Sequence, residues 1–153
     1  MKKILLITLL LIVGCSKPEP INYETTLVNR KGVFYTNDTN KPYSGPVFSL
    51  YDDGKKKEEG NFKDGKPDGL MISWYENGQK EWERTYKDGE DDGLRTNWWK
   101  NGQKSEEGTY KDGKEDGKWT KWDNNGQKRN EWTYKDGKRD GLYTSWYWNG
   151  QKS

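Results

Sequence analysis

The feature that most constrains the fold is a segment that returns every 24 residues. "FKDGKPDGLMISWYENGQ" begins at Phe62 and "YKDGEDDGLRTNWWKNGQ" at Tyr86, and similar segments begin at Tyr110 and Tyr134. Self-similarity at a fixed period is the mark of repeat architectures, in which each unit contacts only its neighbours. We therefore expect one repeat domain, whose units share one local structure.

Each unit predicts a pair of antiparallel strands. Asn77-Gly78 lies between two runs rich in aromatic and β-branched residues, which is a strong hairpin pattern. No run has helical periodicity, and glycines interrupt every candidate helix. Two kinds of turn therefore alternate along an all-β, single-layer antiparallel meander of repeated β-hairpins. The Asn-Gly turns are at 77–78, 101–102, 125–126 and 149–150, and the Asp-Gly turns at 64–65, 88–89, 112–113 and 136–137.

The turn length decides which side chains share a face. A three-residue loop ending in a left-handed Gly78 places Trp74 across from Lys80, and Leu70, Trp74 and Tyr86 then share a face. A two-residue loop would instead put Leu70 and Trp74 beside acidic side chains. We expect the first arrangement, with Asp-Gly loops that are also of odd length. One face would then carry Phe48, Leu50, Phe62, Leu70, Ile72, Trp74, Trp82, Tyr86, Leu94, Trp98, Tyr110, Trp122, Trp132, Tyr134, Leu142, Trp146 and Trp148.

Three sets of repeated positions follow from this register. The glycines that start alternate strands are expected to be structural, through an unusual backbone conformation or a close approach by a neighbouring ring. The tryptophan ladder and the ring that opens each unit are expected to form a thin aromatic core, although the ladder could alternatively stack on a glycan. Aromatic residues off that face are candidates for a ligand or partner surface. The glycines are Gly69, Gly93, Gly117 and Gly141; the ladder is Trp74, Trp98, Trp122 and Trp146; the opening rings are Phe62, Tyr86, Tyr110 and Tyr134; the surface candidates are Tyr75, Trp99, Trp119, Tyr143 and Tyr147.

The first residues have the pattern of a secretory signal peptide. Lys2 and Lys3 precede the apolar run 4–13, which is too short to span a bilayer, and Gly14 and Cys15 follow. The stretch "IVGC" resembles the bacterial lipobox, which implies cleavage before Cys15 and its acylation, for instance with palmitate. The alternative is an ordinary signal peptide beside a free cysteine. We expect a signal peptide at 1–14, a tether at 15–29 and a repeat domain at 30–153, held at the cell envelope, with the outer membrane or cell surface preferred.

The composition excludes several kinds of function. There is no histidine, and Cys15 is the one cysteine, so Ser-His and Cys-His nucleophiles and common zinc sites are absent. Without Lys2 and Lys3, 25 basic residues balance 25 acidic ones, which disfavours nucleic acid as a partner. Aspartate pairs recur in every Asp-Gly loop, as turn residues do, and lack the EF-hand spacing. We expect no enzyme activity, no cofactor and no metal site, with calcium binding left open.

The repeated residues resemble a known family. The pattern "YKDGKxDG", a strand with Leu and Trp, and then "NGQ" resembles the MORN repeat in its bacterial variant, over roughly residues 32–153 with a degenerate first unit. The resemblance implies an elongated, twisted, single-layer sheet of hairpins, and bacterial relatives are often labelled toxin–antitoxin components. The eukaryotic form commonly has histidine at the positions of Asp68, Asp92, Asp116 and Asp140.

These features predict a membrane-anchored scaffold that binds a protein and has no catalytic role. The alternatives are glycan or cell-wall binding through the aromatic residues, an antitoxin or immunity-like role as the family label implies, and contact with lipid headgroups. The last predicted strand, 142–148, is followed by no further unit in this sequence. It is therefore expected to leave an edge that can pair with a partner strand.

Overall fold

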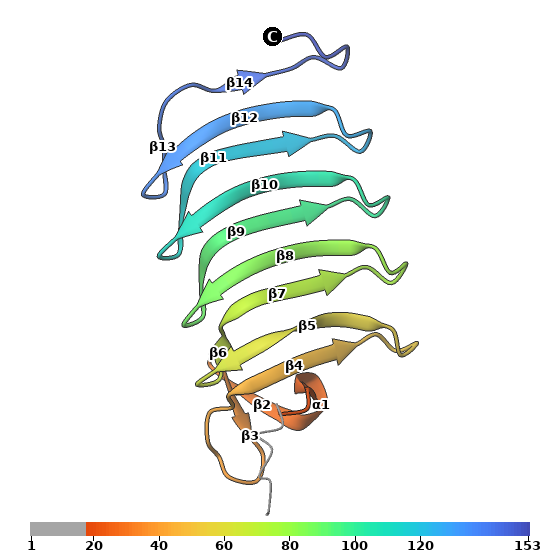
Figure 1. The fold of residues 1–153 in the computed structure, drawn as a ribbon, viewed down its shortest axis with the longest axis vertical. Coiled ribbons are helices and arrows are strands. Elements are labelled where there is room, and N and C mark those ends of the chain that lie inside the picture. The colour runs from red at the N-terminus through yellow and green to blue at the C-terminus, as the bar shows by residue number, and fades with distance from the viewer. Residues whose placement is uncertain (1–17) are drawn as a thin grey trace, which may run out of the picture.

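The computed structural model describes residues 18–153, so the predicted signal peptide and Cys15 lie outside the described residues. Figure 1 shows an elongated single-layer sheet whose strands stack along the long axis of the molecule. Twelve strands form this sheet in the order β1-β4-β5-β7-β8-β9-β10-β11-β12-β13, with β14 on β12 and β6 on β5. The all-β prediction is confirmed. The repeated strands are β4 (Gly45–Leu50), β5 (Lys56–Lys63), β6 (Lys66–Pro67), β7 (Gly69–Trp74), β8 (Lys80–Lys87), β9 (Glu90–Trp98), β10 (Lys104–Lys111), β11 (Lys114–Trp122), β12 (Lys128–Lys135), β13 (Lys138–Arg139) and β14 (Thr144–Ser145).

The two kinds of turn differ in length. At the Asn-Gly turn, Gly78 has φ 82° and donates its N–H to the Tyr75 carbonyl at 2.8 Å, while the Tyr75 N–H donates to Gln79. This is the predicted three-residue loop. At the Asp-Gly turn, Asp88 and Gly89 both have positive φ, 50° and 90°, inside a two-residue loop of the primed type. The prediction of odd-length Asp-Gly loops is therefore wrong.

A β-bulge beside each of the first three Asn-Gly turns also changes the register. Trp74 pairs with Lys80, as predicted, but the next pair is Ser73 with Trp82, so Glu81 is an extra residue on β8. A one-residue shift moves every later side chain to the other face. Beyond the bulge, Leu70 pairs with Thr85 rather than lying beside an aromatic ring.

The predicted common aromatic face is therefore wrong. We name the two observed faces after equivalent positions of β4, β7, β9 and β11: face A carries Val47, Met71, Arg95 and Trp119, and face B carries Phe48, Ile72, Thr96 and Thr120. Trp74 and Tyr86, expected on one side, lie on opposite sides of the sheet. Of the predicted set, face A holds Phe62, Trp82, Tyr86, Tyr110, Trp132 and Tyr134, and face B holds Phe48, Leu50, Leu70, Ile72, Trp74, Leu94, Trp98 and Trp122.

A cap covers the N-terminal end of face A. Strand β1 (Ile21–Asn22) adds to β4 in parallel, and helix α1 (Tyr23–Thr26) and the hairpin of β2 (Leu27–Arg30) and β3 (Val33–Thr36) follow. The predicted tether is therefore too long, because the chain is folded from β1 onward. No helix of the described residues 18–153 is long and apolar enough to cross a membrane.

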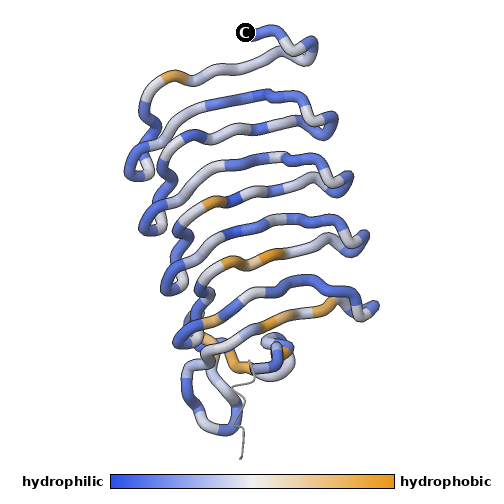
Figure 2. Tube along the Cα trace, in the orientation of Figure 1, coloured by the Kyte–Doolittle hydropathy of each residue, from blue (hydrophilic) through white to orange (hydrophobic). Residues whose placement is uncertain are grey.

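The cap and the first hairpins share the apolar core. Leu27, Val47, Phe62 and Met71 form one buried cluster, and the Tyr23 ring lies 5.5 Å from the Phe62 ring between centroids. Burial and a hydrogen bond to a glutamate raise the pKa of the Tyr23 hydroxyl. Figure 2 shows that the most hydropathic residues gather at this end, while the later hairpins are mostly hydrophilic or intermediate.

Aromatic rings replace the aliphatic core in the later hairpins. Trp119 and Trp132 are 4% and 6% exposed and stack on each other at 6.5 Å between centroids. Tyr110 and Tyr134 meet the Trp119 ring edge-on at 5.3 Å and 5.9 Å. No segment between residues 18 and 153 forms a second layer over these rings, so they bury one another.

The last predicted strand is shorter than expected. Only β14 is regular, and it pairs with β12 through Ser145 and Thr144. Leu142 is 87% exposed and Trp148 is 77% exposed. Within the described residues β14 has a full partner strand on one side only, which explains why fewer backbone bonds hold it.

Candidate binding surfaces

Side chains beside the Asn-Gly turns connect neighbouring units. The Tyr75 hydroxyl donates to the Trp98 carbonyl at 2.8 Å, and the Trp99 indole N–H donates to the Trp122 carbonyl at 3.3 Å. Burial, and then the charge of Glu81, raise the pKa of Tyr75. Two of the predicted surface residues, Tyr75 and Trp99, thus also hold one hairpin to the next.

The other predicted surface residues differ widely in exposure. Trp119 is 4% exposed and lies in the aromatic stack of face A, where little of it can meet a protein. Tyr143 and Tyr147 are 53% and 57% exposed, and Trp99 is 41% exposed. Exposure therefore leaves Trp99, Tyr143 and Tyr147 as surface aromatics of this set.

The tryptophan ladder lies on face B and alternates with lysines. The Lys56 ammonium lies 5.3 Å from the Trp74 ring centroid, and Lys80 lies 5.6 Å from the Trp98 ring. Each ladder lysine also pairs with the glutamate three residues later, as Lys80 does with Glu83. These lysines were not predicted as partners of the ladder, although the spacing Lys-x-x-Glu recurs in every unit. Cation–π contact occupies the rings of Trp74, Trp98 and Trp146, so the ladder supports the sheet and is poorly placed for stacking on a glycan.

The four glycines that were predicted to start strands all have a positive φ, although only Gly69 begins a strand: Gly93 and Gly117 lie within β9 and β11, and Gly141 lies outside the regular strands. Gly69 and Gly117 have φ 84° and 78°, a region that residues with a side chain rarely adopt. At Gly93, with φ 127°, an added Cβ would also lie 2.9 Å from the Thr85 side chain. Gly141 has φ 84°. The backbone alone therefore accounts for glycine at these positions.

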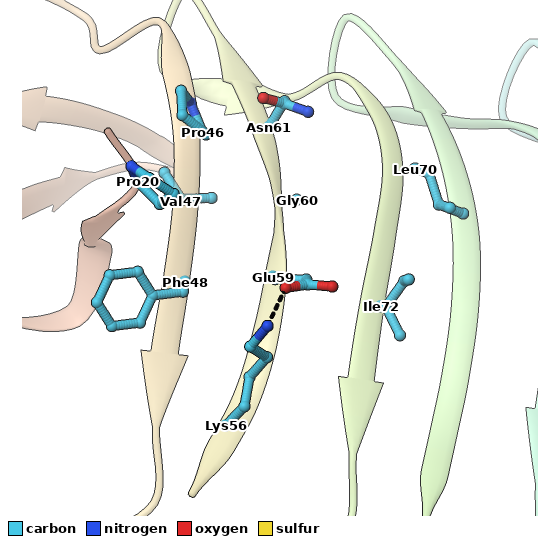
Figure 3. A pocket seen from close by; sticks show the side chains of 10 residues that line it. All are labelled: Pro20, Pro46, Val47, Phe48, Lys56, Glu59, Gly60, Asn61, Leu70 and Ile72. Carbon is cyan, nitrogen blue, oxygen red and sulfur yellow. Dashed lines mark hydrogen bonds and ion pairs between the residues drawn. The ribbon is translucent and has the colours of Figure 1, made fainter. Parts of the chain in front are cut away.

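Face B has an apolar groove near the N-terminal end. It has a volume of about 500 Å³, and Pro20, Phe48, Leu70 and Ile72 line it (Figure 3). The ion pair of Lys56 and Glu59 lies along its wall. Leu94 on β9 is at the position equivalent to Leu70 on β7, on the same face of the sheet. It therefore extends the apolar surface of face B beyond the groove.

Face A has a polar hollow near the C-terminal end, with a volume of about 340 Å³. Strands β9 to β12 supply most of its walls. Its cations are Arg95, Lys121 and Arg139, and its acids are Glu106 and Glu115. Asn130, two tryptophans and three tyrosines complete the lining: Trp119, Trp132, Tyr110, Tyr134 and Tyr143.

Some contacts in this hollow are already made within the chain. Lys121 pairs with Glu106 at 3.2 Å, and Arg95 donates to the Tyr110 hydroxyl at 3.2 Å. Burial, partly offset by Arg95, raises the pKa of Tyr110. The guanidinium of Arg139 lies 5.5 Å from the Trp132 ring centroid. The lining is therefore mixed in charge, with one more cation than acid.

No group of three or more metal-ligating side chains that could hold an ion occurs among residues 18–153. The geometry instead defines a class: a single-layer β-repeat scaffold with a groove on one face and a hollow on the other. A family model described as the MORN repeat variant matches residues 43–64, 67–88, 91–112 and 115–136, more than half of the chain. The chain belongs to this family, whose repeats generally form non-catalytic binding scaffolds. No curated protein matches the chain.

Proposed function

We propose that the chain is a lipid-anchored, non-catalytic scaffold that binds a protein partner at the cell envelope. The observation that carries the proposal is the groove of face B, which Leu70 lines, together with the exposed Leu94 in the same row beyond it. Leu70 is 49% exposed and Leu94 is 54% exposed, and the lysine–glutamate pairs lie beside them. An apolar centre with a charged rim is the usual anatomy of a protein interface.

The partner is expected to insert an apolar side chain between Phe48 and Leu70. A groove of about 500 Å³ is larger than any one side chain, so it accommodates a leucine or an aromatic ring with its flanking backbone. The Lys56–Glu59 pair then provides polar contacts at the rim. Such anchors in a pocket supply most of the affinity of a protein interface.

The anchor would hold this groove close to the membrane. Five residues separate Cys15 from the folded strand that starts at Ile21, so the two residues can be at most about 22 Å apart. Pro20, at the end of this link, itself lines the groove. The partner is therefore expected to be another envelope protein or the exposed part of one.

The test of partner binding uses leucines of two regions. Mature chain carrying Leu70→Glu and Leu94→Glu is compared with wild type by crosslinking in intact envelopes and mass spectrometry of the captured proteins. Leu142→Glu is the matched control, because Leu142 is 87% exposed and lies outside both the groove and the regular strands of face B. A specific partner should be lost from the double variant and kept by the control. Identical captured proteins from all three chains would contradict the proposal.

The anchor is tested separately. Cells are labelled with an alkyne analogue of palmitate, and the wild type should carry the label and fractionate with the envelope. The Cys15→Ser variant should carry no label and leave the membrane fraction. Label that persists in Cys15→Ser would exclude lipidation at this residue. The identity of the captured protein also tests the antitoxin-like role that the label of bacterial relatives implies, since that role requires a toxin.

A further inference from the structure

The hollow of face A contains buried hydrogen-bond donors that lack an acceptor. The indole Nε1 atoms of Trp119 and Trp132 and the Nε atom of Arg95 have no partner among residues 18–153. Both indoles line the hollow and are more than nine-tenths buried. Buried donors in folded proteins are nearly always paired, so three unpaired donors around one hollow indicate a missing acceptor.

The charged residues in and beside the hollow also indicate a missing acceptor. Arg95 lines the hollow, and Arg84, which lies outside it, is directly opposite Arg95 on the neighbouring strand, although like charges in that position repel. Neither arginine takes part in an ion pair within the described part of the chain. Lys121, by contrast, is already paired with Glu106. The unsatisfied groups among the described residues that line this hollow are therefore donors, and one of them, the Arg95 Nε atom, belongs to a cation that has no ion pair.

We propose that this hollow binds an organic carboxylate. The carboxylate oxygens accept from Arg95 and from the indole N–H groups of Trp119 and Trp132, and the organic part lies against the tyrosine rings. The planar fork of an arginine matches a carboxylate. Glu106 and Glu115 in the walls disfavour a more highly charged anion such as phosphate. The site is independent of the groove on face B, and either can fail without the other.

The experiment follows the indole N–H signals of the nine tryptophans in the ¹⁵N-labelled mature chain. The probes are acetate, succinate and glucuronate, added at constant ionic strength with sodium chloride as the balance. The signals of Trp119 and Trp132, assigned by Trp→Phe replacement, are expected to shift and saturate. Those of Trp98 and Trp122, which lie on face B, are expected to stay in place.

An arginine pair provides the matched variants. Arg95→Gln is expected to weaken binding at least tenfold and to leave the circular dichroism melt intact. Arg95→Lys separates charge from the planar fork and should weaken binding less. The control is Arg129→Gln, because Arg129 pairs with Asp123 at 2.9 Å outside the hollow and should not affect binding.

The outcomes are distinct. The proposal is overturned if no probe gives a saturable shift of Trp119 or Trp132, or if the folded Arg95→Gln chain binds as tightly as wild type. A short glycine peptide with a free or an amidated C-terminus then identifies the source. Tighter binding of the free-ended peptide than of succinate supports a peptide carboxylate, and the reverse order supports a free organic acid.

Discussion

The two ends of face A bury equivalent positions in different ways. Met71 lies under the cap, in a cluster with Leu27 and Phe62, whereas Trp119, 48 residues later, is covered only by other rings. Both side chains are 4% exposed. A single-layer sheet can therefore hide a side chain either under a second layer of chain or by stacking large rings along its own surface.

The two solutions differ in what they leave unpaired. The clustered side chains of the capped end are mostly aliphatic or phenyl, and the orphan groups near them are the Ser49 hydroxyl and the Nε atom of Arg84, which is opposite Met71. The aromatic end uses tryptophan, whose ring carries an N–H, and leaves Trp119 and Trp132 without acceptors. Replacing aliphatic residues with indoles thus provides burial together with donors that a ligand can use.

The largest expected effect compares Phe62 with Tyr134, which opens the third unit after it. Phe62 is 5% exposed under Tyr23 and Phe34, so Phe62→Ala should lower the free energy of unfolding by about 3–5 kcal/mol. Tyr134 is only partly buried, so Tyr134→Ala should lower it by about 2 kcal/mol. Urea denaturation measures both. Equal losses of unfolding free energy would mean that ring stacking stabilises the aromatic end as much as the cap stabilises the N-terminal end.

A second comparison adds one methyl group at equivalent glycines. An added Cβ at Gly108 would lie 2.1 Å from the Trp119 ring, and at Gly60 it would lie 2.2 Å from the Met71 sulfur. The Met71 side chain can change rotamer, and only the Leu70 carbonyl oxygen, 2.8 Å from the same added Cβ, must then shift with its backbone. The Trp119 ring, by contrast, is fixed between neighbouring rings. Gly108→Ala should therefore destabilise by about 2–3 kcal/mol and Gly60→Ala by about 1–2 kcal/mol. Thermal denaturation shows which variant loses more stability. A larger loss for Gly60→Ala would show that side chains are packed more tightly under the cap than in the aromatic stack.

The smallest expected effect concerns two glutamates of face B. Glu131 accepts from Lys118 and Lys128, at 2.8 Å and 3.0 Å, and these bonds lower its pKa. Because the folded pKa lies below the unfolded one, the contribution to stability is present above the unfolded pKa and is lost as pH falls through the folded pKa. Glu131→Gln should therefore lower the unfolding free energy by about 0.5–1 kcal/mol at pH 7 and not at pH 2.

The matched variant is Glu59→Gln at the capped end. Glu59 pairs with Lys56 alone, so its replacement should have about half the effect at pH 7. Urea titrations at both pH values measure the two differences. A loss that persists at pH 2 would show that Glu131 acts through packing rather than charge.

The sequence predicted the repeats, the turns and the all-β class, because glycine positions and the period are local properties. It failed on the register, which depends on the bulge at Glu81 and on the two-residue Asp-Gly loop at Asp88. A single extra residue moves every later side chain to the opposite face of the sheet. The pattern of apolar residues therefore cannot assign the faces unless the turn type is also known. The dipeptide Asp-Gly is itself typical of a two-residue hairpin and could have corrected the loop length.

The hollow and the cap could not be predicted from the sequence, because both depend on contacts between distant residues. Trp119 was predicted to be a surface residue, and its burial depends on Trp132 and Tyr134, which only the true register places beside it. The cap depends on contacts such as Tyr23 with Phe62, nearly 40 residues apart, in a stretch with no periodic pattern. Long-range pairing of this kind leaves no local mark in the chain.

The bonds between neighbouring hairpins have a consequence for how such a molecule changes over generations. The Tyr75 hydroxyl and the Gly89 N–H each bond the backbone of the adjacent unit and nothing farther along. In-frame duplication or loss of one 24-residue segment would therefore recreate a matched junction at the seam. The length of the sheet can therefore change in steps of one hairpin, about 10 Å each. The capped end and the aromatic end would keep their different ways of burying side chains.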